Sequence, residues 1–372
     1  MRIGIPKECK INENRVAITP AGVAALTSAG HSVFIQSGAG LGSGITDREY
    51  TASGAVISGD PGEVWSKAEL MLKVKEPLPE EYKYLRQDLV LFTYLHLAPE
   101  PELTRVMLDS KMVGIAYETV QIDSGTLPLL EPMSEVAGKM AIQIGAQFLC
   151  RHDGLGAGIL LGGVPGVPAG HVVIVGGGIV GTNAAKMAVG TGARVTLLDI
   201  RIDRLRYLDD IFRGRIVTTA ANSHTISYAV RDADMVVGAV LIPGGRTPKL
   251  ITEAMVKTMR PGSVLVDVAI DQGGCIETID RVTSHKDPVF VKHGVIHYAV
   301  GNMPGAVPHT STFALTNVTL PYALQLAGKG WRQACRDNAA LARGVNIVNG
   351  ACTYAAVAEA QNLPFTSLAS LL

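Results

Sequence analysis

Residues 171–181 read His-Val-Val-Ile-Val-Gly-Gly-Gly-Ile-Val-Gly. The aliphatic run predicts a strand, and Gly176, Gly178 and Gly181 follow it with the spacing G-x-G-x-x-G. In turns that bind dinucleotides, one glycine makes the turn, one lets the backbone approach the pyrophosphate, and one lets the next helix pack close to the strand. An alanine-rich stretch, residues 182–189, predicts that helix, whose N-terminus would present free N–H groups to phosphates. The stretch therefore predicts a dinucleotide-binding unit.

The next predicted strand ends on Asp199, close to the ~20-residue spacing at which an acidic residue binds the adenosine ribose. Its carboxylate would accept hydrogen bonds from the ribose hydroxyls and repel a 2′-phosphate, which favours NAD over NADP. Arg201 and Arg204 would weaken this preference, because arginine can hold a 2′-phosphate. The alternative is a structural glycine turn with Asp199 as an ordinary helix cap, and the complete strand–turn–helix–strand pattern argues against it.

Length and composition limit the classes of protein to which the chain can belong. Its 372 residues are enough for two domains of ~150 residues each. Hydrophobic residues make up 47% and charged residues 18%, which excludes a disordered chain. The 33 Lys+Arg balance 33 Asp+Glu, which argues against a nucleic-acid-binding protein. The five cysteines form no C-x-x-C pair, and no His/Cys/Asp cluster has ligand spacing, so we expect no metal.

One uncharged stretch needs an explanation. Residues 154–185 lack Asp, Glu, Lys and Arg, but they hold many glycines together with Pro165 and Pro168. A membrane-spanning helix would not tolerate so many helix breakers at its centre, so we interpret the stretch as loop, strand, loop and helix. The opening residues 1–8 predict a strand and leave no room for an apolar signal segment. We therefore expect a soluble, cytoplasmic protein.

Short aliphatic runs alternate with helical stretches, which predicts an α/β fold with parallel sheets covered on both faces. Strands are expected at residues 2–5, 31–36, 70–75, 88–95, 112–116, 172–176, 194–199, 215–220, 235–240 and 263–269. A helix capped by Thr19 should end near Gly30, and another should cover residues 100–110. A further helix should start at a Ser134 cap and run to about Cys150.

We expect two doubly wound, parallel-sheet domains. A Rossmann domain for NAD, residues 129–308, would be inserted into a discontinuous substrate domain. The substrate domain would consist of residues 1–128 and a helical return, residues 309–372, because the last helices are too few to form a domain alone. Ligands of such sheets bind beyond the carboxyl ends of the strands, so a cleft between the domains should hold both ligands.

Several polar residues lie where strands are predicted to end. Lys73 and Lys75 alternate on one strand and would share a face near the ligand crevice, with two solvated lysines as the alternative. His96 closes another strand, and histidine suits proton transfer near neutral pH, although a buried structural histidine is the alternative. Asp267 and Asp271 flank Val-Ala-Ile at the end of a third strand and suggest a loop that lies over the nicotinamide, unless either aspartate simply forms the turn.

Arg15 lies between the first strand and the first helix, in Glu13-Asn14-Arg15-Val16. A guanidinium at this place would hold a substrate carboxylate through two parallel hydrogen bonds. Together with the dinucleotide-binding unit, these polar residues indicate an oxidoreductase that acts on a small acid.

Further motifs follow one another along the whole chain. They are Gly4-Ile5-Pro6-Lys7-Glu8, Glu13-Asn14-Arg15-Val16-Ala17-Ile18-Thr19-Pro20, Lys73-Val74-Lys75-Glu76-Pro77, Tyr94-Leu95-His96, Pro132-Met133-Ser134, Val268-Ala269-Ile270-Asp271-Gln272-Gly273-Gly274 and Asn302-Met303-Pro304. In this order they resemble the motifs of the alanine dehydrogenase/pyridine nucleotide transhydrogenase family. Within that family, the motifs at His96 and Asp271 and the lack of a membrane-spanning segment favour the branch that oxidises L-alanine.

The resemblance implies NAD-dependent, reversible oxidative deamination of L-alanine to pyruvate and ammonium. It implies that Arg15 and Lys75 bind the substrate and that His96 and Asp271 are catalytic. The cofactor contacts that it implies, with those of the glycine turn, are Ser134, Gly176, Gly178, Gly181, Asp199, Arg204, Val240, Asp271, Arg281, Asn302 and Met303. It also implies small-molecule partners only, with neither nucleic acid nor membrane, and a homohexamer.

Three alternatives stay open. The first is the soluble NAD-binding subunit of a proton-translocating transhydrogenase, which needs no amino-acid pocket. The second is an amino-acid dehydrogenase of the saccharopine or lysine type, which a scan of substrates would distinguish. The third is a catalytically silent NAD-sensing protein, against which the presence of Arg15, Lys75, His96 and Asp271 argues.

Overall fold

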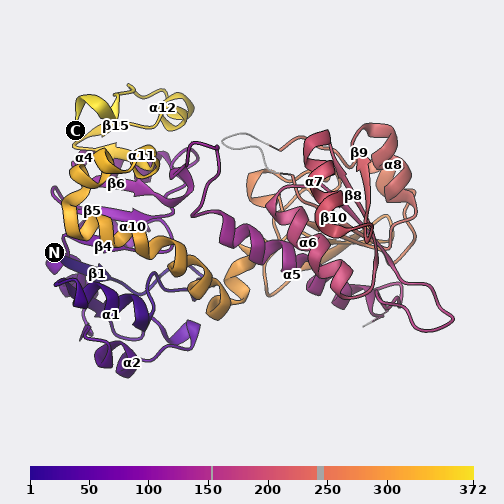
Figure 1. Cartoon of the computed structure of the whole chain (residues 1–372), viewed down its shortest axis with the longest axis horizontal. Coiled ribbons are helices and arrows are strands. Elements are labelled where there is room, and N and C mark those ends of the chain that lie inside the picture. The colour runs from indigo at the N-terminus through magenta and orange to yellow at the C-terminus, as the bar shows by residue number, and fades with distance from the viewer. Residues whose placement is uncertain (152–153, 241–246) are drawn as a thin grey trace. The chain divides into compact units, whose positions relative to one another are not determined.

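The chain forms two compact α/β units, which we describe separately in this computed structural model (Figure 1). The structure describes residues 1–151, 154–240 and 247–372. The first unit comprises residues 1–133 and 305–372, and the second comprises residues 134–304. The boundaries predicted from the sequence lie within a few residues of these divisions, and the function of each unit stays a prediction.

Within the described residues, the first unit contains an eight-stranded sheet with the order β15-β14-β6-β5-β4-β1-β2-β3. Its strands are β1 (Arg2–Ile5), β2 (Ser32–Gln36), β3 (Val56–Ser58), β4 (Leu70–Leu72), β5 (Val90–Thr93), β6 (Val113–Ala116), β14 (Val345–Val348) and β15 (Ala351–Cys352). Strands β1 to β6 are all parallel. Their order, β3-β2-β1-β4-β5-β6, is the doubly wound order, which reverses between β1 and β4.

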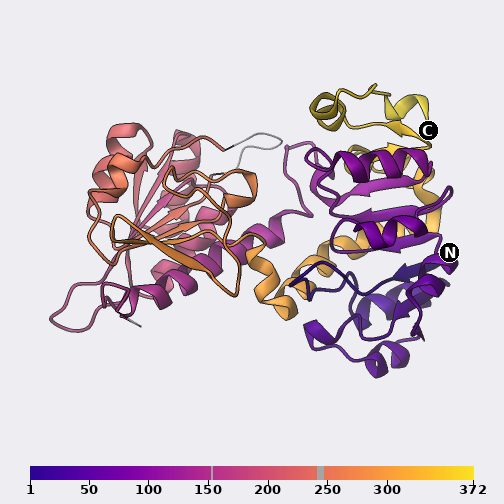
Figure 2. The same cartoon turned by 180° about the vertical axis from the view of Figure 1, so that it is seen from behind.

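Helices cover both faces of this sheet (Figures 1 and 2). They are α1 (Pro20–Ser28), α2 (Asp47–Ala52), α3 (Pro61–Lys67), α4 (Pro101–Asp109), α10 (Pro308–Asp337), α11 (Ala339–Arg343) and α12 (Ala355–Gln361). α1 packs against α10, which is kinked at Gly330. On the other face, Trp65 of α3, Met107 of α4 and Val357 of α12 share one hydrophobic core. Thr19 caps α1 by accepting a hydrogen bond from the Gly22 N–H, as predicted.

The described part of the second unit contains a seven-stranded sheet with the order β12-β13-β11-β10-β7-β8-β9. Its strands are β7 (His171–Val175), β8 (Arg194–Asp199), β9 (Val217–Ala220), β10 (Met235–Gly238), β11 (Val264–Asp267), β12 (Val289–Lys292) and β13 (Val295–Tyr298). The order of its parallel strands, β9-β8-β7-β10-β11-β13, is the Rossmann order, which reverses between β7 and β10. Both units therefore have the α/β architecture that the sequence predicts.

Successive side chains of β7 point to opposite faces of the sheet, and helices pack against both faces. The helices of the second unit are α5 (Glu131–Leu149), which begins in the first unit, α6 (Ile179–Gly190), α7 (Ile202–Phe212), α8 (Ser223–Arg231) and α9 (Glu253–Val256). Val173 and Val175 share a core with Ile226 of α8 and Met255 of α9. Ile174, between them, lies near Gly181 of α6. A strand buried on both faces explains the continuous aliphatic run before the glycines.

Three local features of the structure differ from those predicted from the sequence. The segment after Pro308 is not helical to the end, because β14 and β15 form a hairpin around Asn349-Gly350 (φ 48° and 83°) that adds antiparallel strands to the first sheet. β12 and β13 were also missed, and their turn is likewise left-handed. Such two-residue turns with positive φ are typical of hairpins. Ser134 does not cap α5, since the helix begins at Glu131 with a proline in its first turn.

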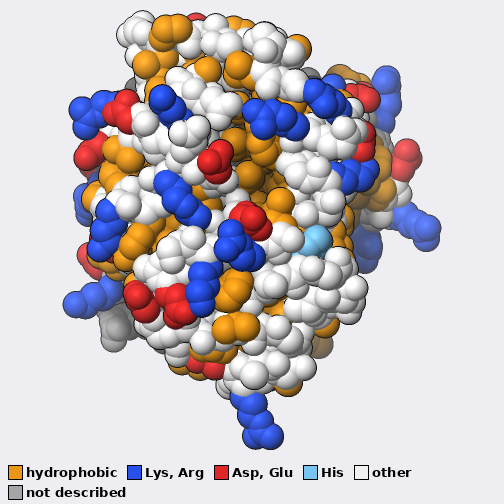
Figure 3. Space-filling view, turned by 90° about the vertical axis from the view of Figure 1, so that its left-hand side faces the viewer, with side chains coloured by type: hydrophobic (Ala, Val, Ile, Leu, Met, Phe, Trp, Pro, Cys, Tyr) orange, Lys and Arg blue, Asp and Glu red, His pale blue; other side chains and the backbone are white. Residues whose placement is uncertain are grey.

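The surface of the first unit carries both signs of charge. Figure 3 shows lysines and arginines interspersed with aspartates and glutamates on the face that it presents. This mixture agrees with the formal net charge of +0 for the whole chain. Among the residues that the structure describes, no helix has the length and apolar character needed to cross a membrane.

Candidate active site

The strand order places several predicted residues at one edge of the first sheet. Ligands of doubly wound sheets bind beyond the carboxyl ends of the strands, at the point where the order reverses. In the first unit this point lies between β1 and β4. Arg15 lies in the segment after β1, Lys75 follows β4, and His96 follows the neighbouring strand β5. The topology thus brings these three predicted residues to the same edge.

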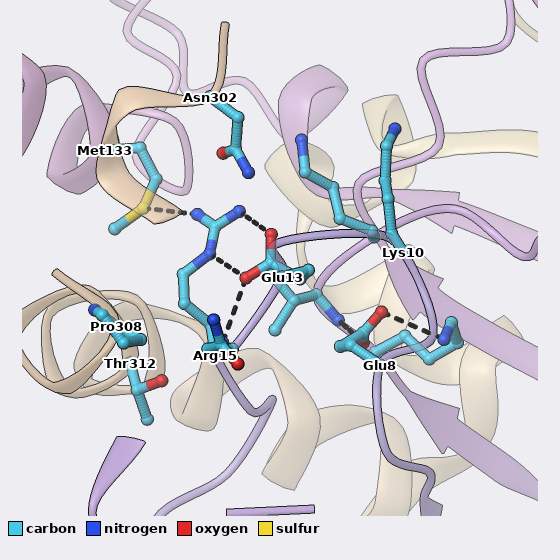
Figure 4. Close-up of polar contacts among 12 residues, drawn as sticks. Glu8, Lys10, Glu13, Arg15, Met133, Asn302, Pro308 and Thr312 are labelled. Atoms are coloured by element: carbon cyan, nitrogen blue, oxygen red, sulfur yellow. Dashed lines mark hydrogen bonds and ion pairs between the residues drawn. The ribbon is translucent and has the colours of Figure 1, made fainter. Parts of the chain in front are cut away.

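Arg15 is held in one orientation by its neighbours (Figure 4). It is 2% exposed, and Glu13 accepts hydrogen bonds from its Nε (2.7 Å) and Nη2 (2.5 Å). Nη1 points to Sδ of Met133 at 3.0 Å. Burial would raise the pKa of Glu13, but the hydrogen bonds and charge of Arg15 hold this pKa below its usual range. A fixed, permanently charged guanidinium results, which suits recognition of a small carboxylate.

Lys73 is a structural residue, not a ligand-binding one. β4 ends at Leu72, earlier than predicted, because the Val74 N–H donates to a Glu8 carboxylate oxygen (2.7 Å) instead of to a strand. The Lys73 side chain is fully buried, and its ammonium pairs with Glu8 (3.1 Å) and Glu81 (2.9 Å). These two carboxylates outweigh the effect of burial and raise the pKa of Lys73. The expectation that both lysines face the ligand crevice is therefore wrong for Lys73.

Lys75 is the lysine that can meet a ligand. It is half-buried, and the described residues supply its ammonium with no hydrogen bond or ion pair. Burial, together with the positive charge of Arg15, lowers its pKa below the ordinary value of 10.5. A desolvated lysine beside a fixed arginine is stabilised when an anion binds between or near them.

We predict that Lys75→Met stabilises the protein at neutral pH and abolishes turnover. The pKa of Lys75 is lower in the folded chain than in the unfolded chain, so the charged ammonium opposes folding. This cost is fully present below the folded pKa and disappears as the pH rises from that value towards 10.5. Thermal unfolding should therefore show a gain in Tm at pH 7 that shrinks near pH ~10. The exposed Lys67, changed to Met, should give no such gain; an equal gain in Lys67→Met would contradict the explanation.

His96 is accessible and lies at the same edge. Its side chain is 42% exposed, which excludes the alternative of a buried structural histidine. The Tyr94 ring lies 5.8 Å from the imidazole, and the Tyr94 hydroxyl donates to the Leu129 carbonyl oxygen at 2.6 Å. The Glu118 carboxylate accepts a hydrogen bond of 2.6 Å from the His96 backbone N–H. The imidazole is thus free to contact a ligand beside a firmly held backbone.

In the second unit, the glycine turn after β7 has the geometry that its sequence predicts. Gly176 has a φ of 107°, and a Cβ on Gly181 would lie 1.8 Å from the Gly176 carbonyl oxygen, so α6 packs directly on the turn. Among the described residues, a Cβ on Gly178 would meet nothing within 4 Å, and no side chain caps the helix N–H groups there. This open space before an uncapped helix N-terminus fits the pyrophosphate of a dinucleotide.

Gly178→Ala and Gly181→Ala should separate cofactor binding from folding. Gly181→Ala places a methyl group against a backbone carbonyl, so it should lower the free energy of unfolding by at least ~1–3 kcal/mol. Gly178 has an ordinary φ of −66°, so alanine should leave the unfolding free energy unchanged but weaken NADH binding by at least ~10-fold, or ~1.4 kcal/mol. Urea unfolding and NADH fluorescence titration measure the two effects. If Gly178→Ala binds NADH as tightly as the wild type, the turn is not part of the cofactor site.

Asp199 and Arg204 both support the glycine turn. Asp199 Oδ2 accepts a hydrogen bond from the Gly177 N–H (2.7 Å), and Oδ1 accepts one from the Arg201 N–H (2.8 Å). Arg204 donates from Nε to the Gly177 carbonyl oxygen (2.6 Å) and from Nη2 to Thr182 Oγ1 (2.7 Å). The N-cap of α7 is Arg201, so Asp199 is not the helix cap of the alternative interpretation. Direct contacts of Asp199 and Arg204 with a cofactor stay predictions.

The two aspartates at and after the end of β11 differ in the same way as the two lysines. Asp267 is fully buried and accepts hydrogen bonds from three backbone N–H groups of residues 269–276, at 2.9 to 3.1 Å. It fixes the loop, so Asp267 has the turn-forming role of the two predicted for it, and the position of the loop over a nicotinamide stays a prediction. Asp271, on this loop, is exposed, and its Oδ2 accepts a hydrogen bond of 3.2 Å from the Asn302 N–H. Two predicted site residues of the second unit therefore lie together.

The remaining predicted cofactor residues are spread over the second unit. Met303 is 2% exposed and Ser134 lies in the first helical part of α5. Val240 follows β10 and is half-buried, and the residues directly after it lie outside the described part of the chain. Arg281 is exposed, and its guanidinium lies 4.2 Å from the centre of the Phe290 ring. Their roles stay predictions.

Two carboxylates of the first unit were not identified as functional from the sequence. Glu13 lies two residues before Arg15, which is a signal for a local ion pair. Glu118 follows β6 at the edge where His96 follows β5, but only the pairing of the two strands brings them together. Single-sequence patterns give no signal for such a pairing of side chains.

The fold and these residues define a class of protein. One unit has the Rossmann strand order and a glycine turn that fits a dinucleotide, and the other has a fixed arginine, a lysine and a histidine where its strand order reverses. Together they define a dinucleotide-dependent dehydrogenase.

The chain belongs to the alanine dehydrogenase/PNT family. Residues 4–137 match its N-terminal domain and residues 141–355 its C-terminal domain. An alanine dehydrogenase of Methanococcus maripaludis is 62% identical over 366 residues, 98% of either chain. The alanine dehydrogenase of Geobacillus stearothermophilus is 60% identical, with 100% of either chain covered.

Solved structures give the same relationship. An L-alanine dehydrogenase has a TM-score of 0.94 and 50% sequence identity, with 97% of this chain and 99% of that chain covered. A transhydrogenase from Sinorhizobium meliloti has a TM-score of 0.80 at 25% identity, with 96% and 100% covered. The similarity to alanine dehydrogenases is thus much greater than the similarity to the transhydrogenase.

Proposed function

We propose that this protein is an NAD-dependent alanine dehydrogenase. The reaction is L-alanine + NAD⁺ + H₂O ⇌ pyruvate + NH₄⁺ + NADH + H⁺. The observation that carries the proposal is the buried pair of Arg15 and Glu13 beside Lys75, where the first sheet reverses its strand order. Sequence identities of 62% and 60% to two alanine dehydrogenases over nearly their full length give independent support.

Arg15 and Lys75 bind the substrate in this proposal. The Arg15 guanidinium, oriented by Glu13, holds the carboxylate of alanine. Lys75 donates a hydrogen bond to the oxygen that forms at the second carbon, and its own desolvation makes an oxygen anion or carbonyl a favourable partner. Removal of solvent around the two cations strengthens both interactions.

In this proposal His96 transfers protons and Asp271 stabilises the substrate nitrogen. When bound, NAD⁺ accepts the hydride from Cα, so that alanine becomes an imine. His96 takes a proton from the water that adds to the imine carbon and delivers it to the amine, which then leaves. The exposed Asp271 carboxylate stabilises the positive nitrogen and orients the water.

The second unit binds the cofactor, and we propose NAD instead of NADP. The space at Gly178 and the uncapped start of α6 suit the pyrophosphate, while Asp199, at the end of β8, is placed to repel a 2′-phosphate. Asp199→Ala should narrow the preference for NAD in kcat/KM. Because Asp199 also holds Gly177, thermal unfolding of the variant must accompany the assay. Equal efficiency of the wild type with both cofactors contradicts NAD specificity.

The decisive experiment measures NADH formation with a panel of L-amino acids. Alanine should be the best substrate, serine or 2-aminobutyrate weaker, and lysine inactive. Comparable rates with lysine would support the saccharopine or lysine type. NADH binding without turnover of any amino acid would support a silent NAD-sensing protein, and hydride exchange between nucleotides without alanine turnover would support a transhydrogenase subunit.

We also propose that the protein acts as a cytoplasmic homohexamer on small molecules. The family resemblance supports the hexameric state. The cytoplasmic location is supported by the sequence pattern, in which we predict neither a signal segment nor a membrane-spanning helix. Mass photometry of the purified protein tests the hexamer, and cell fractionation tests the compartment.

A further inference from the structure

The Glu118 carboxylate contacts both the backbone and the ring of His96, and the reaction proposed above assigns Glu118 no role. Its Oε1 accepts hydrogen bonds from the backbone N–H groups of His96 (2.6 Å) and Leu95 (3.2 Å). The same Oε1 lies 3.4 Å from Nδ1 of the His96 imidazole. One carboxylate therefore touches the backbone and the ring of the same histidine.

The position of Glu118 is determined by the sheet. β5 and β6 are parallel neighbours, with Thr93 opposite Ala116. His96 follows β5, and Glu118 lies in the short 3-10 helix Tyr117–Thr119 that follows β6. The Glu118 side chain is 17% exposed, whereas that of His96 is 42% exposed. The carboxylate thus approaches the histidine from the protein side and leaves the opposite side of the ring to solvent or a ligand.

The His96 backbone needs this support. Its φ of 49° is left-handed, a conformation that few residues other than glycine adopt, although histidine adopts it more often than most. Such backbone strain persists only where the surroundings impose it, and it is concentrated at functional sites. The hydrogen bonds from two successive N–H groups to Glu118 hold the chain in this conformation.

We propose that Glu118 is the positioning residue for His96, an inference that rests on the proposed function. Glu118 accepts the Nδ1–H of the neutral imidazole and thereby fixes its tautomer. Nε2 then carries the lone pair and faces away from the carboxylate, where it can take a proton from water. The Nδ1 contact of 3.4 Å is long, as is common for catalytic hydrogen bonds before a substrate binds.

Three variants test this role. Glu118→Ala removes every acceptor oxygen, whereas Glu118→Gln retains one. Glu49→Ala is the matched control, because Glu49 also accepts a backbone hydrogen bond, from the Thr46 N–H at 2.7 Å, but caps α2, which follows β2, three strands from β5 in the sheet. Each variant is assayed for kcat, for KM of alanine and for NADH affinity. Solid-state ¹⁵N NMR of histidine-labelled protein at alkaline pH reports the ring tautomer, and His96→Gln identifies the signal.

We expect wild-type His96 to be in the Nδ1–H form. Glu118→Ala should lower kcat by at least ~10-fold, part of the ~10²–10⁴-fold of general acid–base catalysis, and should mix the tautomers. KM and NADH affinity should stay within ~2-fold, because binding is not affected. Glu118→Gln should restore most of the Nδ1–H form and part of kcat, and Glu49→Ala should change neither quantity.

Other results overturn the inference. It is wrong if wild-type His96 is in the Nε2–H form, or if Glu118→Ala keeps both the tautomer and kcat. A parallel loss of kcat, substrate binding and NADH binding would indicate a merely structural role. If Glu118→Ala does not fold, the wild-type tautomer and Glu118→Gln still decide. Failure of the wild type to oxidise alanine refutes the proposed function, but the tautomer measurement tests the Glu118 contact separately.

Discussion

Arg15→Ala is expected to lower kcat/KM for L-alanine by ~10²–10³-fold, while NADH affinity stays within ~2-fold of the wild type. The guanidinium is the fixed cation of the proposed carboxylate site, and truncation of one partner of a buried charge pair costs ~2–5 kcal/mol. NADH binding should survive because the glycine turn belongs to the other unit. Initial rates and fluorescence titration measure the two effects. Loss of NADH binding would show that the assignment of functions to the units is wrong.

The same substitution should also destabilise the protein by ~3–5 kcal/mol, because it removes the cation that pairs with the buried Glu13 carboxylate. The double variant Arg15→Ala/Glu13→Ala should recover much of that stability without any activity. Arg15→Lys is the matched control for charge. It keeps the positive charge but cannot bond Glu13 through two parallel N–H groups, so it should retain more stability than Arg15→Ala and little activity.

Asp271→Asn is expected to reduce kcat by at least ~10²-fold, the scale of losing one preorganised electrostatic contact. Asparagine has the same shape and retains an oxygen that can accept the hydrogen bond from the Asn302 N–H. Only the negative charge near the substrate nitrogen is lost, so NADH binding and Tm should remain unchanged. Steady-state kinetics, titration and thermal unfolding check the three quantities.

Two neighbouring aspartates provide controls for this experiment. Asp280→Asn changes an exposed aspartate paired with Arg281 and should leave kcat unchanged. Asp267→Asn disturbs the three backbone hydrogen bonds that hold the loop and should reduce Tm as well as kcat. If Asp271→Asn retains wild-type kcat, the charge has no part in the reaction.

Local patterns in the sequence predict most of the architecture. The glycine turn, the Thr19 cap and the buried strands each depend on residues close together in the chain, and the structure confirms them. The hairpins around Asn349-Gly350 and His293-Gly294 were missed although each contains a turn signal. β14 pairs with β6, which is distant in the sequence, so no local pattern indicates that the segment completes the sheet.

Side-chain roles were less predictable than strands. Lys73 and Lys75 are two residues apart, just after the end of the same strand. Glu8 and Glu81 enclose Lys73 and raise its pKa, whereas the pKa of Lys75 is lowered. The difference arises from carboxylates that approach from other segments of the chain. Asp267 and Asp271 also differ: the N–H groups that donate to Asp267 lie within nine residues of it, whereas Asp271 accepts from the distant Asn302 N–H. Sequence spacing places such residues at the right edge but does not distinguish between them.

The discontinuity of the first unit affects the order in which the protein can fold during synthesis. The second unit, residues 134–304, has all its strands before the last part of the chain leaves the ribosome. The first unit must wait for β14, whose Val345 pairs with Ile115, and until then β6 presents an unpaired edge. A nascent chain that has emerged from the ribosome as far as residue 304 would therefore carry one finished sheet and one that can pair with other chains, which makes this stage the one most in need of a chaperone.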